Sequence, residues 1–159
     1  PTDLHLHRGL GPCPADGYAD PRHLALGWRA YRQAAQNDDT VAWDALYVAH
    51  LIPETGVELH PDTFILEAGF ERLNGVDFRK GCYVGQEVTA RMKHKTELRK
   101  GLARVSVTGA AAPGTPITAD NKPVGTLHSV AGAEGIAYLR FDRATGPMQA
   151  GDAEVTRIP

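Results

Sequence analysis

The sequence predicts an α+β protein whose last third is a small antiparallel β-sandwich or β-barrel. Three observations support this prediction: helical spacing of apolar residues over 40–52, a second helical repeat after Gly81, and a change of pattern beyond Lys100. In the last third, short alternating runs are separated by Gly, Pro and Asn, which is typical of small antiparallel β structures. We therefore predict a boundary near residue 98, which divides the chain into residues 1–97 and 98–159.

The β part is expected to consist of several short strands. Alternating apolar and polar residues occur in four runs, at 101–109, 115–132, 134–143 and 152–159. Turn-forming residues lie between these runs, as expected for antiparallel strands that follow one another in a small sheet.

The part before the boundary mixes both element types. Residues 23–31 (HLALGWRAY) alternate and predict a strand. The sequence NDD at 37–39 is a helix-start signal, and Pro53 is expected to end the helix that follows. Its expected apolar stripe is Val41, Ala45, Val48 and Ile52. Residues 63–66 look like a buried strand, and Asn74-Gly75 like a tight turn.

Trp43 stands within the first predicted helix, between Val41 and Ala45. One interpretation is a core residue. The other is a flat aromatic wall for a planar ligand.

Composition excludes several classes of protein. The chain has 159 residues, of which 42% are hydrophobic and 23% charged, so it can bury a core without cross-links. No apolar run approaches the about 18 residues of a membrane span. Cys13 and Cys82 are the only cysteines, too few for a disulfide framework or a zinc motif. We expect free thiols in a reducing compartment, and no bound metal.

Charge is distributed unevenly along the chain. Between Arg79 and Arg104 there are eight Lys and Arg but only two acids, a net charge of +6 in a chain whose total is −2. A basic stretch of this kind suits an anionic partner such as a phosphate, a polyglutamate tail or RNA. A solvated helix face followed by a basic strand edge is the alternative interpretation.

The segment KGCYVGQE, residues 80–87, places Cys82 among glycines. Val84, Val88 and Met92 recur every four residues, so residues 82–95 predict a helix that buries this stripe. At 100° per residue, Cys82 then shares the opposite face with Gln86, Thr89 and Lys93. A thiol in a first helical turn, preceded by Lys80, is favoured as the thiolate. Gly81 and Gly85 would form a bare ridge that a ligand can approach. A buried structural cysteine is the alternative.

Catalysis by a Cys–His pair finds no local support. The nearest downstream histidine, His94, would lie roughly 18 Å along the predicted helix. A base would have to come from elsewhere in the fold, for instance from His50 or His60.

The segment KGCYVGQEVTAR, residues 80–91, closely resembles the signature of the YgfZ family of folate-binding proteins, which are relatives of the glycine-cleavage T-protein (aminomethyltransferase). The signature runs Lys-Gly-Cys-aromatic-x-Gly-Gln-Glu-x-x-Ala/Ser-Arg, and this sequence matches every defined position. Residues 51–59, 74–82, 99–107 and 124–130 are also similar to segments of that family, so the resemblance covers roughly residues 20–159.

The resemblance implies a T-protein fold: a ferredoxin-like, folate-binding α/β portion in residues 1–97, and a small antiparallel C-terminal β-barrel in residues 98–159. It implies tetrahydrofolate, or a one-carbon derivative, as cofactor. It also implies a role in assembling or repairing iron–sulfur clusters of client enzymes, including tRNA-modifying ones. The implied location is the cytoplasm, or the mitochondrial matrix in a eukaryote.

The resemblance also implies site residues. Cys82 would be the functional thiol, accompanied by Lys80, Gln86, Glu87 and Arg91. The residues implied in folate binding are Trp43, Gly81, Tyr83 and Gly85.

The sequence departs from the family in three places. It has Gly69-Phe70-Glu71 where the family often has Asn-Leu-Asp, and Leu51 where Gly is common. The family's N-terminal half and an initiator Met are not in this sequence. We therefore expect a fragment, a cleaved chain, or a protein whose other half is a separate chain and a partner.

Two other function classes stay open, and so does the question whether the protein is an enzyme. One is a folate-dependent aminomethyltransferase, although the T-protein lacks this cysteine signature. The other is a non-catalytic module that docks RNA or an acidic protein through residues 79–104. Direct binding of nucleic acid is the less favoured partner prediction, and no membrane binding is expected.

Overall fold

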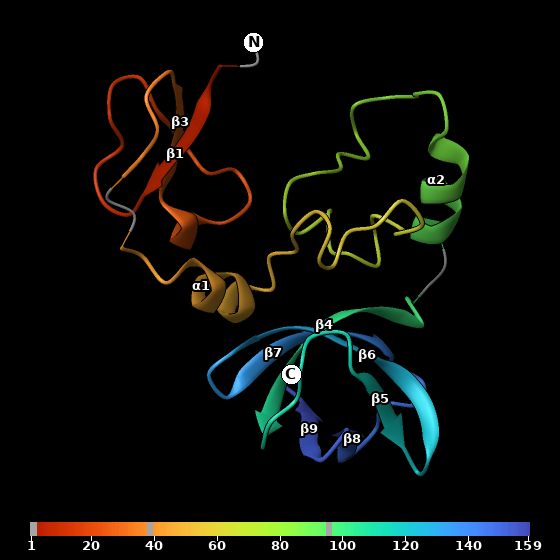
Figure 1. The fold of residues 1–159 in the computed structure, drawn as a ribbon. Coiled ribbons are helices and arrows are strands. Elements are labelled where there is room, and N and C mark those ends of the chain that lie inside the picture. Colours follow the sequence, from red (N-terminus) through yellow and green to blue (C-terminus); the bar gives the residue numbers. More distant parts are fainter. Residues whose placement is uncertain (1–2, 38–39, 95–96) are drawn as a thin grey trace.

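The computed structural model describes residues 3–37, 40–94 and 97–159. Figure 1 shows a closed barrel formed by the C-terminal strands and, above it, the segments that precede the barrel in sequence. Two of the three residues in the predicted helix-start signal, at 38 and 39, lie outside the described residues.

The C-terminal part is a closed six-stranded antiparallel barrel, which decides between the predicted sandwich and barrel. Its strands follow the closed order β4-β7-β6-β5-β8-β9 (Figure 1). Their bounds are β4 Lys100–Thr108, β5 Pro116–Ala119, β6 Lys122–Ala131, β7 Glu134–Arg140, β8 Met148–Ala150 and β9 Ala153–Arg157. The predicted runs contain all of these strands except the short β8, which has three residues.

Side chains of the barrel strands alternate between the barrel interior and its outer surface, and both faces bury apolar residues. Val105 and Val107 of β4 and Leu139 of β7 are buried in the barrel interior. Leu102 and Ile136, on the same two strands, instead join a cluster outside the barrel with Val48. Because successive side chains of a strand point to opposite faces, β4 and β7 line the barrel and also support the elements packed on it.

The N-terminal residues form a small antiparallel sheet of order β1-β3-β2. The strands are β1 His5–Gly9, β2 Tyr18–Ala19 and β3 Trp28–Arg32. The prediction of a strand over 23–31 is only partly right, because Leu24–Leu26 form a turn of 3-10 helix (η1). Gly27 follows with φ 63°, and a Cβ there would lie 2.1 Å from the Gly9 carbonyl oxygen. The strand therefore begins only after this glycine.

Helix α1 spans Trp43–His50, within the predicted 40–52. Its predicted apolar stripe is wrong in part, because Ala45 is exposed while Trp43 and Tyr47 are buried. Trp43 and Tyr47 pack with Leu26, Ile52 and Leu73, whereas Val48 packs on the barrel. The helix is covered on two sides, so its buried surface is wider than a single stripe. It ends at His50, before Pro53, where Leu51 takes a left-handed conformation with φ 52°.

Residues 51–80 are turns and irregular structure. The strand predicted at 63–66 is wrong: the Ala68 amide donates to the Phe64 carbonyl and the Phe70 amide to the Ile65 carbonyl, as in helical turns. Leu66 and Ala68 are buried, so the apolar run reflects burial against the barrel rather than a strand period. Asn74 takes a left-handed φ of 58° before Gly75, which confirms a turn, but no strands flank it.

The described residues ahead of the barrel contain one three-stranded sheet and two α-helices, the second being α2, Gln86–His94. They do not make a complete ferredoxin-like module. Of the predicted T-protein architecture, the structure therefore confirms the C-terminal barrel.

Asp20 ties the small sheet to the loop before it. Its side chain is 4% exposed and bonded by Arg22 at 2.9 Å and Arg29 at 2.7 Å. Burial raises the pKa of this carboxyl, but hydrogen bonds from the two guanidinium groups outweigh that effect and lower the pKa to about 2. A buried carboxylate is thus stabilised by two fixed positive charges.

We expect Asp20→Asn to lower the free energy of unfolding by about 2 kcal/mol near pH 6. A folded-state pKa of about 2, below the ordinary 3.8, stabilises the fold above pH 3.8, and this stabilisation disappears as the pH falls toward 2. The difference between variant and wild type in urea unfolding should therefore shrink over that range. The exposed Asp16, which pairs with Arg32 at 2.7 Å, is the matched control. Asp16→Asn should change stability much less. Equal effects of the two substitutions would contradict this account.

Candidate functional site

The signature segment folds differently from the predicted continuous helix. Gly81 and Gly85 have φ values of 94° and 85°, a conformation that residues with side chains rarely adopt. Gly85 interrupts the helical run, so α2 begins at Gln86. The Gln86 side-chain oxygen accepts a hydrogen bond from the Tyr83 amide at 3.2 Å, which closes the turn. A Cβ at either glycine would meet open space, so backbone conformation, not close approach, requires them.

The predicted buried stripe on this helix is wrong. Val84 and Val88 have 102% and 51% of their surface exposed, and no residue of α2 is buried. The described contacts that hold α2 are made by Lys93. Its Nζ lies 2.6 Å from a Glu71 carboxylate oxygen and 5.2 Å from the centroid of the Phe78 ring. The apolar repeat is therefore present, but the described residues of the chain do not bury Val84 and Val88.

Cys82 is exposed and lines a hollow of about 340 Å³. Other residues lining it include Phe78, Tyr83, Gln86, Lys93 and His94. The predicted grouping of Cys82 with Gln86 and Lys93 is therefore correct, whereas Thr89, predicted on the same face, does not line the hollow. The predicted place of the thiol in a first helical turn is wrong, because three residues separate it from α2.

His94 lines the same hollow as Cys82. The expected separation along one continuous helix is wrong, because residues 82–85 are not helical. Neither His50 nor His60 is among the residues that line this hollow. Sequence reasoning missed Phe78 and His94 as neighbours of the thiol, since only the turn at Gly85 brings both into the hollow.

The remaining signature residues lie on the exposed surface. The Lys80 ammonium is 4.8 Å from the centroid of the Tyr83 ring. Glu87 and Arg91 form the predicted i, i+4 ion pair, with both side chains largely exposed. Neither of the two lines the Cys82 hollow. As an ion pair they add no net charge to this surface.

Trp43 lies apart from the thiol. Its side chain is buried, and the Arg8 guanidinium stacks 4.3 Å from the ring centroid. Trp43 also lines a hollow of about 490 Å³ with Asp44 and Val130. This hollow shares no lining residue with the Cys82 hollow. The core interpretation of Trp43 is thus confirmed, and its role as a wall for a planar ligand stays a prediction.

The described residues form neither a metal-ligand cluster nor a membrane-spanning helix. No three or more His, Cys, Asp or Glu side chains in the described ranges come together as a metal site. None of the helices formed by these residues has the length and apolar character needed to cross a bilayer.

Both thiols should react in the folded protein. We expect native protein to release two equivalents of thionitrobenzoate from Ellman's reagent without denaturant, because Cys13 and Cys82 are both exposed. Cys82→Ser should leave one fast equivalent, and so should Cys13→Ser. A slow second phase that appears only in urea and disappears in Cys82→Ser would contradict the exposed position of Cys82.

Comparison with known proteins places the chain among relatives. Residues 99–159 match the family model described as CAF17, C-terminal beta-barrel domain. The chain is 33% identical to the mitochondrial iron-sulfur cluster assembly factor IBA57 of Homo sapiens over 158 residues, covering 87% of this chain and 43% of the human protein. The mouse IBA57 (Mus musculus) is 33% identical over 145 residues, covering 81% of this chain and 40% of the mouse protein.

A bacterial relative matches as well. The tRNA-modifying protein YgfZ of Vibrio vulnificus strain CMCP6 is 40% identical over 108 residues, which cover 65% of this chain and 32% of that protein. The chain spans about two fifths of the length of the IBA57 proteins that it matches. With its closed C-terminal barrel and its homology to both groups, the chain belongs to the family of the IBA57 and YgfZ proteins.

Proposed function

We propose that this chain is part of a tetrahydrofolate-binding factor that assembles or repairs iron–sulfur clusters in client enzymes, including tRNA-modifying ones. Cys82 is its working thiol. The observation that carries the proposal is the exposed Cys82 in a complete signature segment whose helix, α2, has no buried residue. The names of its relatives, an iron-sulfur cluster assembly factor and a tRNA-modifying protein, support it. The proposed location is the cytoplasm, or the mitochondrial matrix in a eukaryote.

The chemistry of the Cys82 surface suits contact with a cluster or its donor. Thiolate sulfur is a soft ligand that iron in clusters prefers. Lys80 and Lys93 lie in the same segment as the thiol and supply positive charge that suits an anionic cluster. A cluster usually takes four ligands, so a second protein would supply the ligands that Cys82 cannot. In this proposal the client protein meets the exposed face of α2.

The residues around Trp43 suit a folate. A pterin is planar and carries N–H donors, and the hollow at Trp43 offers an aromatic ring edge and the Asp44 carboxylate. In the proposal these two residues hold tetrahydrofolate, which supplies one-carbon or reductive chemistry when bound. Residues 1–97 then belong to a T-protein-like folate portion, and the N-terminal half of the whole protein completes it. Gly81, Tyr83 and Gly85 stay in the proposal as the segment that faces the bound folate.

The thiol role predicts a specific loss of function. In a strain that lacks its own factor, the whole protein carrying Cys82→Ser should restore less than about one tenth of the wild-type tRNA methylthiolation. Cys13→Ser should restore it fully, because Cys13 is equally exposed but lies outside the signature. Immunoblots would verify equal protein levels. Full restoration by Cys82→Ser would disprove the role of the thiol.

Folate binding predicts a measurable affinity. Isothermal titration of the whole protein with tetrahydrofolate should give saturable binding, and Trp43→Phe should weaken it about tenfold, or about 1.4 kcal/mol, by reducing the aromatic surface. Trp28→Phe, on β3, is the control and should bind as the wild type does. If neither the whole protein nor this chain binds tetrahydrofolate, the folate part of the proposal fails and the thiol part is tested separately above.

A further inference from the structure

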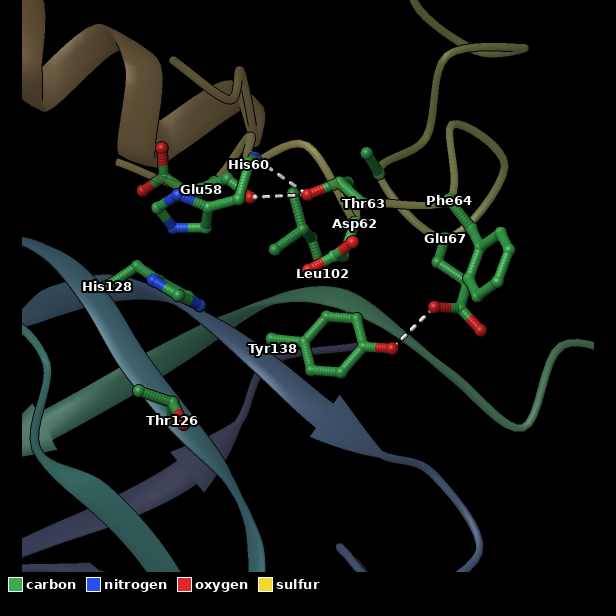
Figure 2. Close-up of a pocket in the computed structure, with 11 residues that line it drawn as sticks. Glu58, His60, Asp62, Thr63, Phe64, Glu67, Leu102, Thr126, His128 and Tyr138 are labelled. Atoms are coloured by element: carbon green, nitrogen blue, oxygen red, sulfur yellow. Dashed lines mark hydrogen bonds between the residues drawn. The ribbon is translucent and has the colours of Figure 1, made fainter. Parts of the chain in front are cut away.

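A second hollow, of about 500 Å³, lies where residues 58–68 pack on the barrel (Figure 2). Its polar lining comes from both sides of this junction: Glu58, His60, Asp62 and Glu67 from the segment, and His128 and Tyr138 from β6 and β7. Leu102 and Phe64 supply apolar walls (Figure 2). Its volume is in the range of small-molecule sites, which often occur where two parts of a protein meet.

The charge of this hollow is one-sided. Three carboxylates line it, and none of the lining residues is Lys or Arg. The two imidazoles of His60 and His128 lie with their ring centroids 6.2 Å apart. Burial lowers the pKa of His128, and the nearby Glu58 carboxylate offsets only part of that effect. His128 is therefore largely neutral at pH 7.

Glu58 is the most deeply buried of the lining carboxylates. It is 4% exposed, and its oxygens accept hydrogen bonds from the Ser129 hydroxyl and, at 3.0 Å, from the Glu54 amide. Among the described residues no cation forms an ion pair with it. Asp20, which is equally buried, has two arginines at 2.7 and 2.9 Å. Since a buried carboxylate is costly without a positive partner, a cationic group bound in the hollow would stabilise Glu58.

Glu67, like Glu58, is a carboxylate of this hollow that no described cation pairs with. It accepts a hydrogen bond from the Tyr138 hydroxyl (Figure 2) and has no described cationic partner. Asp62, at the exposed rim, forms no described hydrogen bond or ion pair. The faces of Tyr138 and Phe64 add surfaces on which a cation can rest. Charge, aromatic walls and volume thus favour the same kind of ligand.

We propose that this hollow binds a small organic cation, an amine or guanidinium group on a short apolar chain. The cationic head lies against Glu58 and Asp62, and the chain lies against Leu102. The hollow shares no lining residue with those of Cys82 and Trp43. The proposal therefore does not depend on the proposed function.

n-Butylguanidine is the test ligand, because it carries the cation and the apolar chain and nothing else. In ¹⁵N-edited NMR of this chain, its titration should shift the amides of His60, Leu102 and Ser129 in a saturable way. n-Butanol and butyrate, which match its chain without the positive charge, should not. Equal shifts with n-butanol, or no saturable shift with n-butylguanidine, would overturn the proposal.

Substitutions of the lining carboxylates test whether the ligand binds in this hollow. Glu58→Gln keeps the shape, with the amide oxygen accepting from the Glu54 amide and the amide nitrogen donating to the Ser129 hydroxyl, and should weaken binding at least about tenfold. Asp62→Asn should weaken it by a smaller factor, and it cannot unfold the protein through a lost contact because Asp62 is exposed. Glu154→Gln, an exposed carboxylate on β9, is the control and should bind as the wild type does. Unchanged affinity in both Glu58→Gln and Asp62→Asn would overturn the site.

A last comparison identifies the source of the cation. Nα-acetyl-arginine methylamide presents the same guanidinium on a polypeptide backbone. Tighter binding of n-butylguanidine supports a free small molecule. Tighter binding of the blocked arginine would overturn that assignment in favour of an arginine side chain of a partner protein.

Discussion

Closure of the barrel through β4 is the constraint on which the rest of the structure depends. β4 pairs with β7 along one edge and with β9 along the other, so its outward face is held rigidly. The Leu102 amide donates to the Glu67 carbonyl at 2.9 Å, and the Arg104 guanidinium donates to the Ala49 carbonyl at 3.0 Å. A Cβ on Gly101 would lie only 2.9 Å from the same Glu67 oxygen. One closed strand thus anchors both α1 and the segment that follows it.

The hollow at Glu58 and the hollow at Cys82 differ in whether the barrel contributes to their lining. The hollow at Glu58 is built directly on β6 and β7, with one wall from the barrel and one from residues 58–68. The Cys82 hollow is built from residues 76–94, and none of its lining residues belongs to the barrel. The first is a preformed pocket between two rigid walls. The Cys82 hollow lies on an exposed surface, which suits a thiol that must contact a large partner.

The sequence predicted the elements whose conformation follows from their own local pattern. It failed where contacts with other parts of the fold determine the conformation or the burial. Alternation placed the barrel strands well, because each is buried on one face. The three residues of β8 are too few to show a period. Trp43 and Tyr47 are buried in place of Ala45 because two different neighbours cover α1. For the site, the exposed face shared by Cys82 and Gln86 could be predicted from spacing, but the reason given for it was wrong. The predicted buried stripe at Val84 and Val88 is in fact exposed.

The sequence by itself determined the antiparallel C-terminal β structure and the first helix, and it singled out Cys82 as the candidate functional residue. Each rests on local patterns: a two-residue period, a helical period and a signature of twelve positions. Only the tertiary structure decided that the β part closes, that Gly85 delays α2, and that Glu58 lies buried without a cation. Those three outcomes depend on edges, backbone conformation and charges brought together from distant parts of the chain, which no local pattern contains.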